Sequence, residues 1–339
     1  MEPIVLGPNQ PTERPYRGGA GIARLRGTDA PGEYAPEDFV ASTTEVFAGG
    51  GVGLTVLPDG RTLRDAVAAD PVGFLGPDHA VVFGANPRLL VKLLDAGERL
   101  FVHFHPGDAF AREYFPHYTG KAEAWHIVAV EGEPVVHLGF ARDVSEAEVA
   151  SWFMQQATDE LLAAMNPVPV HPGDSIFVPA GVPHALGAGI TLVELQQPSD
   201  LSILLEYRGY RDLNLMDSTL GLGPAVVLPE LDRSDWSGER LESLIVRAGG
   251  EAALPPAATS YFRLDRLAVG RDPVPLPRGY AVLVVTAGAG TLAGSGPDVP
   301  LSTGTTVLVP ASAGPRRLIG DGPAGGDLVV LCCRPPAAG

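Results

Sequence analysis

Hydrophobic runs of strand length, separated by turns rich in glycine and proline, recur along most of the chain. Leu100–Ile127 contains two such runs, and Pro134–Phe140 is another. Further runs lie at Tyr280–Thr286 and Asp327–Cys333. Short apolar runs bounded by turn residues are typical of buried strands. The pattern therefore predicts a mainly β fold.

The N-terminal part of the chain is less regular. Residues 1–35 are rich in Gly, Pro and Arg and are expected to wrap the surface. Phe39–Phe47 and Gly53–Leu57 alternate weakly, which indicates two short strands. Leu63–Ala69 is a candidate for a short helix that ends before an Asp-Pro pair.

A helical pattern interrupts the strands after Phe140. Ser145 and Glu148 have the spacing of a capping box, which marks the start of a helix. Two apolar helical faces follow, formed by Val149, Trp152, Phe153, Leu161, Leu162 and Met165. We therefore expect a small helical insertion at about residues 141–167.

A segment near the C-terminus repeats an earlier one. Gly173–Pro179 reads Gly-Asp-Ser-Ile-Phe-Val-Pro, and Gly304–Pro310 reads Gly-Thr-Thr-Val-Leu-Val-Pro. Such self-similarity predicts a second copy of one β unit. The expected domains are residues 1–230, which include the insertion, and residues 231–339. All eight histidines lie at or before His184, so the second domain has no imidazole for a metal.

Three histidines and one glutamate stand at intervals that suit a metal site. His103 and His105 are two apart in an apolar run, so both side chains point to one face of a strand. Glu123 opens the next apolar run, and His184 ends the pattern Gly-x5-Pro-x-Gly-x2-His that begins at Gly173. This spacing is the double signature of the cupin β-barrel. Three imidazoles and a carboxylate suit a divalent transition metal, although histidines of the core or surface could fall at such intervals.

Several motifs together resemble the type I mannose-6-phosphate isomerase family. The segments that carry the resemblance are Leu89–Ala96, His105–Pro106, Gly120–Trp125, Pro179–His184 and Glu194–Asp200. The similarity runs in order from about Pro36 to the C-terminus and is strongest between Pro87 and Asp200. It implies two cupin-type β-barrels (double-stranded β-helix or jelly roll) with the helical insertion beside the substrate cleft.

The resemblance also implies a ligand set. By position, the metal ligands of the family fall on His103, His105, Glu123 and His184. The family usually has Gln where this chain has His103. One divalent ion per chain is expected: Zn²⁺ first, with Fe²⁺, Mn²⁺, Co²⁺ or Ni²⁺ as other fits.

Further site residues follow from the same resemblance. Glu194 matches an acidic residue of the family's active site; the alternative is an exposed carboxylate at the end of a strand. Lys121 stands two residues before Glu123 and so faces the same side of its strand, where it either stabilises a substrate oxyanion or pairs with nearby carboxylates. Lys92 either extends to solvent or points to the substrate. His126 stands where the family commonly has Tyr; it faces away from Glu123, so it belongs to the core or supports a ligand from behind.

Two positions depart from the family in a way that weakens phosphate binding. The family has an arginine where this chain has Leu204, and a serine where it has Phe101. Replacing a cation and a hydroxyl by apolar groups removes contacts that suit a phosphate. Arg208 is the candidate substitute for substrate binding, and Arg211 is a second one.

The composition of the chain limits the kinds of partner that it is expected to bind. The net charge is −16 and the sequence pI is about 4.8, which disfavours nucleic acid and anionic membranes as partners. The two cysteines, Cys332 and Cys333, are adjacent and are not expected to form a disulfide. The first residues have no apolar signal region, and no apolar run is long enough to cross a bilayer. A cytoplasmic protein with a carbohydrate substrate, and a homodimer as one option, is the expectation.

The functional prediction is a metal-dependent aldose–ketose isomerase with an altered phosphate site. It would interconvert mannose 6-phosphate and fructose 6-phosphate through an enediol. Three alternatives stay open: an enzyme acting on an unphosphorylated sugar or polyol, a sugar-binding cupin without turnover, and a cupin iron oxygenase.

Overall fold

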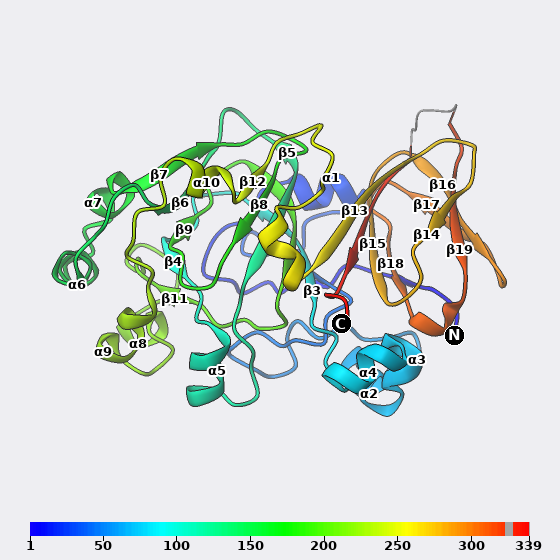
Figure 1. Ribbon diagram of the computed structural model, residues 1–339, viewed down its shortest axis with the longest axis horizontal. Coiled ribbons are helices and arrows are strands. Elements are labelled where there is room, and N and C mark those ends of the chain that lie inside the picture. The colour runs from blue at the N-terminus through cyan, green and yellow to red at the C-terminus, as the bar shows by residue number, and fades with distance from the viewer. Residues whose placement is uncertain (323–327, 339) are drawn as a thin grey trace.

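The computed structural model describes residues 1–322 and 328–338, and its strands form four antiparallel sheets (Figure 1). These sheets are arranged as two pairs. The N-terminal sheet pair lies on the left of Figure 1 and the C-terminal sheet pair on the right. The predicted mainly β fold is confirmed. The strand pairings of the described residues do not close either pair into a barrel, so the prediction of two barrels is not confirmed.

The N-terminal sheet pair contains a six-stranded sheet and a five-stranded sheet. Their strand orders are β12-β8-β5-β10-β3-β2 and β11-β4-β9-β6-β7. The strands are β2 (Glu37–Val40), β3 (Leu90–Ala96), β4 (His103–Phe104), β5 (Glu123–Val130), β6 (Val135–Phe140), β7 (Met165–Pro169), β8 (Ser175–Val178), β9 (His184–Ala185), β10 (Ile190–Gln196), β11 (Ile203–Leu204) and β12 (Ile245–Val246). Because neighbours in these sheets are far apart in the sequence, the pairing brings distant residues together.

The C-terminal sheet pair also consists of two antiparallel sheets, one with five strands and one with four. The orders are β1-β18-β15-β20-β13 and β14-β19-β16-β17. The strands are β1 (Ile4–Leu6), β13 (Arg263–Val269), β14 (Val274–Leu276), β15 (Ala281–Ala287), β16 (Ala289–Gly294), β17 (Val299–Ser302), β18 (Thr306–Val309), β19 (Arg316–Gly320) and β20 (Leu328–Arg334). The two repeated sequence segments contain β8 and β18, which pair with β5 and β15 respectively. The repeat in the sequence thus corresponds to strands with matching neighbours.

Two strands join the sheet pair that their place in the sequence does not predict. β1 pairs with β18 of the C-terminal sheet pair, while β12 pairs with β8 of the N-terminal sheet pair. The division into residues 1–230 and 231–339 stays a prediction.

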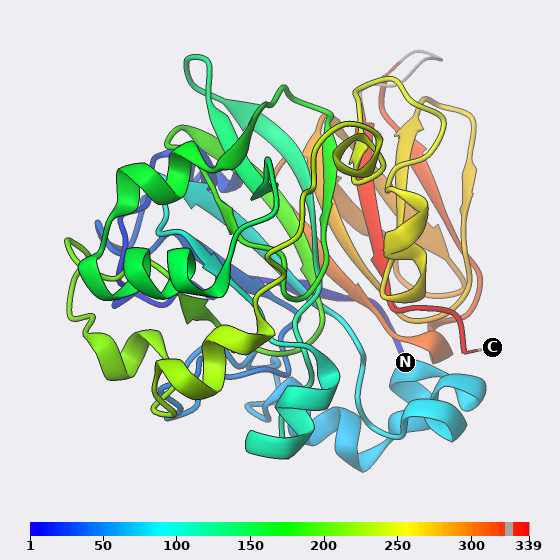
Figure 2. The same cartoon turned by 60° about the vertical axis from the view of Figure 1, so that its left-hand side comes forward.

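The helices lie mostly around the sheets, although the short helix at Pro256–Ser260 lies where the two sheet pairs meet (Figures 1 and 2). They are α1 (Gly21–Arg26), α2 (Leu63–Ala69), α3 (Pro71–Leu75), α4 (Pro77–Phe83), α5 (Asp108–Tyr114), α6 (Glu146–Gln155), α7 (Thr158–Ala163), α8 (Leu215–Ser218), α9 (Pro224–Val227), α10 (Glu239–Glu242) and the 3-10 helices η1 (Leu228–Glu230), η2 (Pro256–Ser260) and η3 (Ala311–Ala313). The capping box of Ser145 and Glu148 is present at the start of α6, and α2 spans the residues predicted for it. Among the described residues, no helix combines the length and apolarity that a membrane span requires.

Three local expectations were wrong or incomplete. The strand predicted at Phe39–Phe47 is only β2, which ends at Val40, and Gly53–Leu57 forms a single bridge between Val56 and Thr62. The chain turns tightly between these two segments, where Gly49, Gly50 and Gly51 all have φ near +75°. Met165 begins β7 instead of ending a helix.

The remaining differences concern the two ends of the chain. Residues 1–35 do not merely wrap the surface, because β1 joins a sheet and Ile22 of α1 is buried. The strand predicted from Asp327 is β20, which begins at Leu328; Asp327 itself lies outside the described residues.

β3 places a charged side chain of the site, that of Lys92, in the interior of the protein. It lies between β10 and β2, and all seven of its residues are buried. A strand buried on both faces is usually apolar throughout, but β3 contains Lys92 and Asp95. Lys92 stands in the middle of this strand, so its charge requires compensation inside the protein.

Candidate metal and active site

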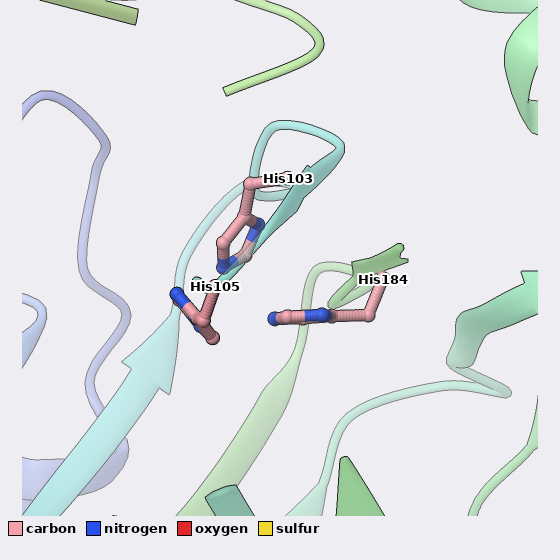
Figure 3. A group of neighbouring side chains, drawn as sticks. All are labelled: His103, His105 and His184. Carbon is pink, nitrogen blue, oxygen red and sulfur yellow. The ribbon is translucent and has the colours of Figure 1, made fainter. Parts of the chain in front are cut away.

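Three histidines from two adjacent strands gather in the interior of the N-terminal sheet pair (Figure 3). His103 lies on β4 and pairs in register with His184 on β9, and His105 follows directly after β4. One nitrogen from each ring lies within 4.8 Å of the others, and all three side chains are buried. The spacing argument therefore predicted correctly that these rings would meet.

Hydrogen bonds define which nitrogen of each ring is free. Each Nδ1 lies beside a backbone carbonyl oxygen. The distance is 3.0 Å from His103 to Phe101 O, 3.0 Å from His105 to Leu201 O, and 2.9 Å from His184 to Val182 O. A carbonyl can only accept, so each Nδ1 must be the protonated nitrogen. Each Nε2 then keeps its lone pair. The Nε2 atoms of His105 and His184 are buried without a hydrogen-bond partner among the described residues.

Glu123 completes this group from β5. One of its oxygens, Oε1, lies 2.9 Å from Nε2 of His105, and the other, Oε2, lies 3.6 Å from Nε2 of His184. Lone pairs of nitrogen and carboxylate oxygen so close together repel unless a cation lies among them. The four residues therefore fit a divalent transition metal, with neutral imidazoles whose second nitrogen is held by a backbone carbonyl.

Burial keeps the imidazoles in the form that binds a metal. Burial first, and then the nearby His105, lowers the pKa of His184 to about 3. Burial, followed by the charges of His184 and His105, lowers the pKa of His103 well below its ordinary value. The rings are therefore neutral at physiological pH, as metal ligation requires.

Lys121 and Glu194 flank the histidine cluster. Lys121 Nζ lies 2.8 Å from Oε1 of Glu123, which brings a cation beside the cluster. Glu194 is buried on β10 and accepts a hydrogen bond of 3.1 Å from Nε1 of Trp125. Burial, and then the charge of Glu123, raises the pKa of Glu194 to about 8. A carboxyl group that titrates near neutral pH can both take up and release a proton.

Lys92 does not extend to solvent. Its Nζ atom donates to Oε1 of Glu37 at 2.9 Å and lies 3.5 Å from Asp200 and 3.9 Å from Glu194. Burial alone would lower the pKa of Lys92, but Glu37 and Asp200 raise it above its ordinary value. Lys92 is therefore a buried cation that holds three carboxylates next to the site.

Arg14 is a residue of the site that sequence reasoning missed. It comes from the irregular N-terminal segment and forms ion pairs with Glu37 and Asp200. No local pattern marks Arg14, because its position depends on contacts with residues 23 and 186 positions away. The rarity of lysine is a signal in the sequence for other residues of the site. The chain has 24 Lys and Arg together, but its two lysines are Lys92 and Lys121, and both are buried at this site.

Two adjoining cavities lead to the cluster. The inner one, of about 40 Å³, is lined by His103, Lys121, Glu123, Trp125, Glu194 and other residues. The outer one, of about 520 Å³, shares four lining residues with it: Arg14, Phe101, Asp200 and Ser202. The inner cavity therefore shares part of its wall with the outer cavity, which is large enough for a small ligand.

The positions that depart from the family line these cavities. Leu204 and Phe101 both face the outer cavity, and Phe101 also faces the inner one. Phe101 packs edge-on against His103, with ring centres 5.0 Å apart. Arg211 lines the outer cavity but is paired with Glu13 and Asp212.

Arg208 does not line either cavity. Its side chain is exposed and donates to the backbone oxygen of Gln155 at the end of α6, and its backbone N–H is held by Gln156. These contacts direct it away from the cluster. His126 also lies elsewhere: it faces away from Glu123, and its Nδ1 is 2.9 Å from Ser175 Oγ.

The fold and the histidine cluster together are consistent with a metal-binding protein of the cupin superfamily. No family model matches the chain. Mannose-6-phosphate isomerase ManA of Bacillus subtilis is 28% identical over 237 residues, which are 68% of this chain and 72% of the relative. Mannose-6-phosphate isomerase of Streptococcus mutans is 34% identical over 145 residues, which are 41% of this chain and 43% of the relative.

Solved structures show the same fold over nearly the whole chain. The mannose 6-phosphate isomerase of Bacillus subtilis has a TM-score of 0.75 at 21% identity, covering 98% of this chain and 100% of that one. A putative mannosephosphate isomerase of Archaeoglobus fulgidus also has a TM-score of 0.75, at 20% identity, covering 99% and 98%. A mannose 6-phosphate isomerase bound with zinc and yttrium has a TM-score of 0.69 at 15% identity, covering 99% and 100%.

The resemblance to the type I mannose-6-phosphate isomerase family is confirmed by these sequence and structure relatives. The prediction that the chain is an enzyme is confirmed with it.

Proposed function

We propose that this protein is a metal-dependent aldose–ketose isomerase. The observation that carries the proposal is one small cavity lined by His103, Glu123, the carboxyl of Glu194 and the ammonium of Lys121. His105 and His184 lie directly behind its wall, in contact with His103 and Glu123. The names of the relatives, all mannose-6-phosphate isomerases, support the same reaction class.

The metal site of the proposal consists of His103, His105, Glu123 and His184. A divalent ion bound there, with Zn²⁺ as the first candidate, would act as a Lewis acid towards sugar oxygens. Its neighbour Lys121 supplies a second positive charge to an oxygen that becomes anionic during the reaction.

Glu194 is the proton carrier of the proposal. Isomerisation removes a proton from the carbon beside the carbonyl and returns it to the neighbouring carbon, so the base must hold the proton in between. Trp125 binds Oε1 of Glu194, which leaves Oε2 to take the proton from one carbon and deliver it to the other.

Charge in the outer cavity bears on the substrate. Four carboxylates line it, those of Glu13, Asp200, Asp212 and Asp217, against the two guanidinium groups of Arg14 and Arg211. A phosphate dianion would meet repulsion there, and Leu204 offers it no donor. This balance favours a second candidate, an isomerase of an unphosphorylated sugar. For a phosphorylated sugar, Arg14 is the outer-cavity arginine that also lines the inner cavity, so it would be the one to contact the phosphate.

A solvent-exchange experiment tests the reaction class. The protein loaded with one Zn²⁺ per chain is incubated in D₂O with a panel of aldoses, ketoses and their 6-phosphates, and deuterium at C1 and C2 is measured by mass spectrometry and NMR. We expect deuterium to enter with at least one sugar pair. Glu194→Gln should abolish this exchange, whereas Glu160→Gln, which removes an exposed carboxylate of α7, should not. Exchange that survives Glu194→Gln would remove Glu194 from its role, and absence of exchange with every sugar would remove the isomerase.

A further inference from the structure

A third cavity lies where the two sheet pairs meet, on the far side of β5 from the histidine cluster. Its volume is about 520 Å³, which is within the range of small-molecule sites. Its lining comes from β5 and β8 of one sheet pair and from β13 and β20 of the other, together with the connecting segment at residues 250–254. None of the residues of the proposed isomerase site lines it.

The walls of this cavity carry an excess of guanidinium groups. The lining contains three arginines, Arg263, Arg266 and Arg334, and two carboxylates, those of Glu251 and Asp265. In a chain with a net charge of −16, three arginines around one cavity oppose the overall balance. A cavity of this kind attracts anions locally although the whole protein repels them.

These arginines are incompletely paired. Asp265 is bound by Nη2 of Arg334 at 2.7 Å, but Nε of Arg334 is buried and has no hydrogen-bond partner within the described part of the chain. Among the described residues, the side chain of Arg263 donates only to the backbone oxygen of Pro335. Arg266 makes no side-chain hydrogen bond or ion pair with any described residue, so its donors are available to a ligand.

The cations also lie close enough to disturb one another. Burial, and then the charge of Arg334, lowers the pKa of Arg263 below its ordinary value. Burial, and then the charge of Arg266, lowers the pKa of His126 to about 4. Each effect is one that a bound anion would reduce, because it would place a negative charge among the positive ones.

We propose that this cavity is a binding site for a small ligand that carries an oxyanion group, either phosphate or carboxylate. Arg263, Arg266 and Arg334 would hold the oxyanion, since the guanidinium fork matches the geometry of both groups. The aliphatic and aromatic part of the lining, which includes Leu254, Phe262 and Leu264, would contact the rest of the ligand. The site is separate from the proposed isomerase centre and does not depend on turnover.

Calorimetric titration tests this site. The protein is loaded with zinc and freed of excess ion, and it is titrated with inorganic phosphate in one series and with acetate in a second. The first variant is Arg266→Gln, whose exposed side chain can be changed without breaking a hydrogen bond or ion pair to any described residue. A charge-assisted contact is worth about 1.5–3 kcal/mol, so its loss should weaken binding of the preferred anion about tenfold or more. Arg263→Gln should have a similar effect.

Two controls keep the outcome unambiguous. Arg271→Gln removes an exposed arginine that does not line the cavity and should leave the affinity unchanged. Lys121→Met removes the cation beside the metal ligands, so it reports on anion bound at the isomerase centre. The proposal is overturned if native protein binds neither anion at millimolar concentration, if Arg266→Gln and Arg263→Gln bind as tightly as native protein, or if only Lys121→Met weakens binding. A preference for phosphate or for acetate identifies which oxyanion the cavity takes.

Discussion

Trp125 and Glu194 face each other in register on the adjacent strands β5 and β10, and the indole Nε1 donates to Oε1 of the carboxyl at 3.1 Å. This contact holds an acidic side chain in a fully buried position. A buried carboxyl prefers its neutral form, because the charged form loses its hydration. The pairing therefore links the proposed proton carrier to the stability of the fold.

The first prediction concerns the pH dependence of stability of the protein freed of divalent metal. The pKa of Glu194 is about 8 in the folded state, above the ordinary value of 4.5. Between these two values the folded chain holds a proton that the unfolded chain has released, so the free energy of unfolding contributed by this group falls as pH rises. The limit is about 1.4 kcal/mol per pH unit.

Urea denaturation at pH 5 and pH 8 measures this effect. Glu194→Gln cannot ionise, so it should lose less stability than native protein between the two pH values. Glu160→Gln, at an exposed site, should behave like native protein. Equal pH dependence of native protein and Glu194→Gln would show that this carboxyl titrates normally.

The second prediction is that one divalent metal binds per chain. His105→Ala and His184→Ala each remove an Nε2 that has no other partner within the described residues, so both variants should lose the metal. Elemental analysis after purification in the presence of Zn²⁺ measures the occupancy. His171→Ala is the matched control, because His171 lies outside the cluster with an exposed ring. Full occupancy in both site variants would contradict the assignment.

A third prediction concerns Lys92. Lys92→Met leaves Glu37 and Asp200 in the interior with Arg14 as their remaining ion-pair partner among the described residues. Breaking a buried ion pair from one side typically costs about 3–5 kcal/mol, so the free energy of unfolding should fall by about that amount. Urea denaturation at pH 7 measures it.

The double variant tests the cause of that loss. Adding Glu37→Gln to Lys92→Met removes one of the uncompensated charges and should restore part of the stability. If the double variant is no more stable than Lys92→Met, lost packing of the lysine side chain rather than the unpaired charge explains the effect.

The fourth prediction concerns Leu204, which lies in register with His103 and lines the outer cavity. Leu204→Arg should raise kcat/KM for mannose 6-phosphate by about tenfold or more, because it adds a charge-assisted contact to the phosphate. Activity on free mannose should rise less, since that sugar has no dianion to contact.

Met216→Arg provides the control for this prediction. It adds the same charge at an exposed position of the outer cavity and, unlike Leu204, on a residue that does not pair with His103, so it should have a smaller effect. Brisk turnover of mannose 6-phosphate by the native protein, unchanged by Leu204→Arg, would show that other groups hold the phosphate.

Local sequence patterns determined the elements and much of the site. Strand-length apolar runs gave the mainly β fold, and the Ser145–Glu148 capping box gave the start of α6. The two-residue spacing of His103 and His105 and the turn before His184 predicted that the rings would meet, as they do. These signals are reliable because side-chain direction along a strand and the chemistry of a turn depend on residues close in the sequence.

Only the tertiary structure decided which charges became partners. Arg14 reaches Asp200 across 186 positions, Lys92 turns inward to Glu37, and Arg208 is held outside by α6. The arginine-lined cavity depends on two sheet pairs meeting at β5 and β13, which no local pattern encodes. Ion pairs form where the folded backbone brings long side chains within a few ångströms, and that approach is set by strand order rather than by spacing along the chain.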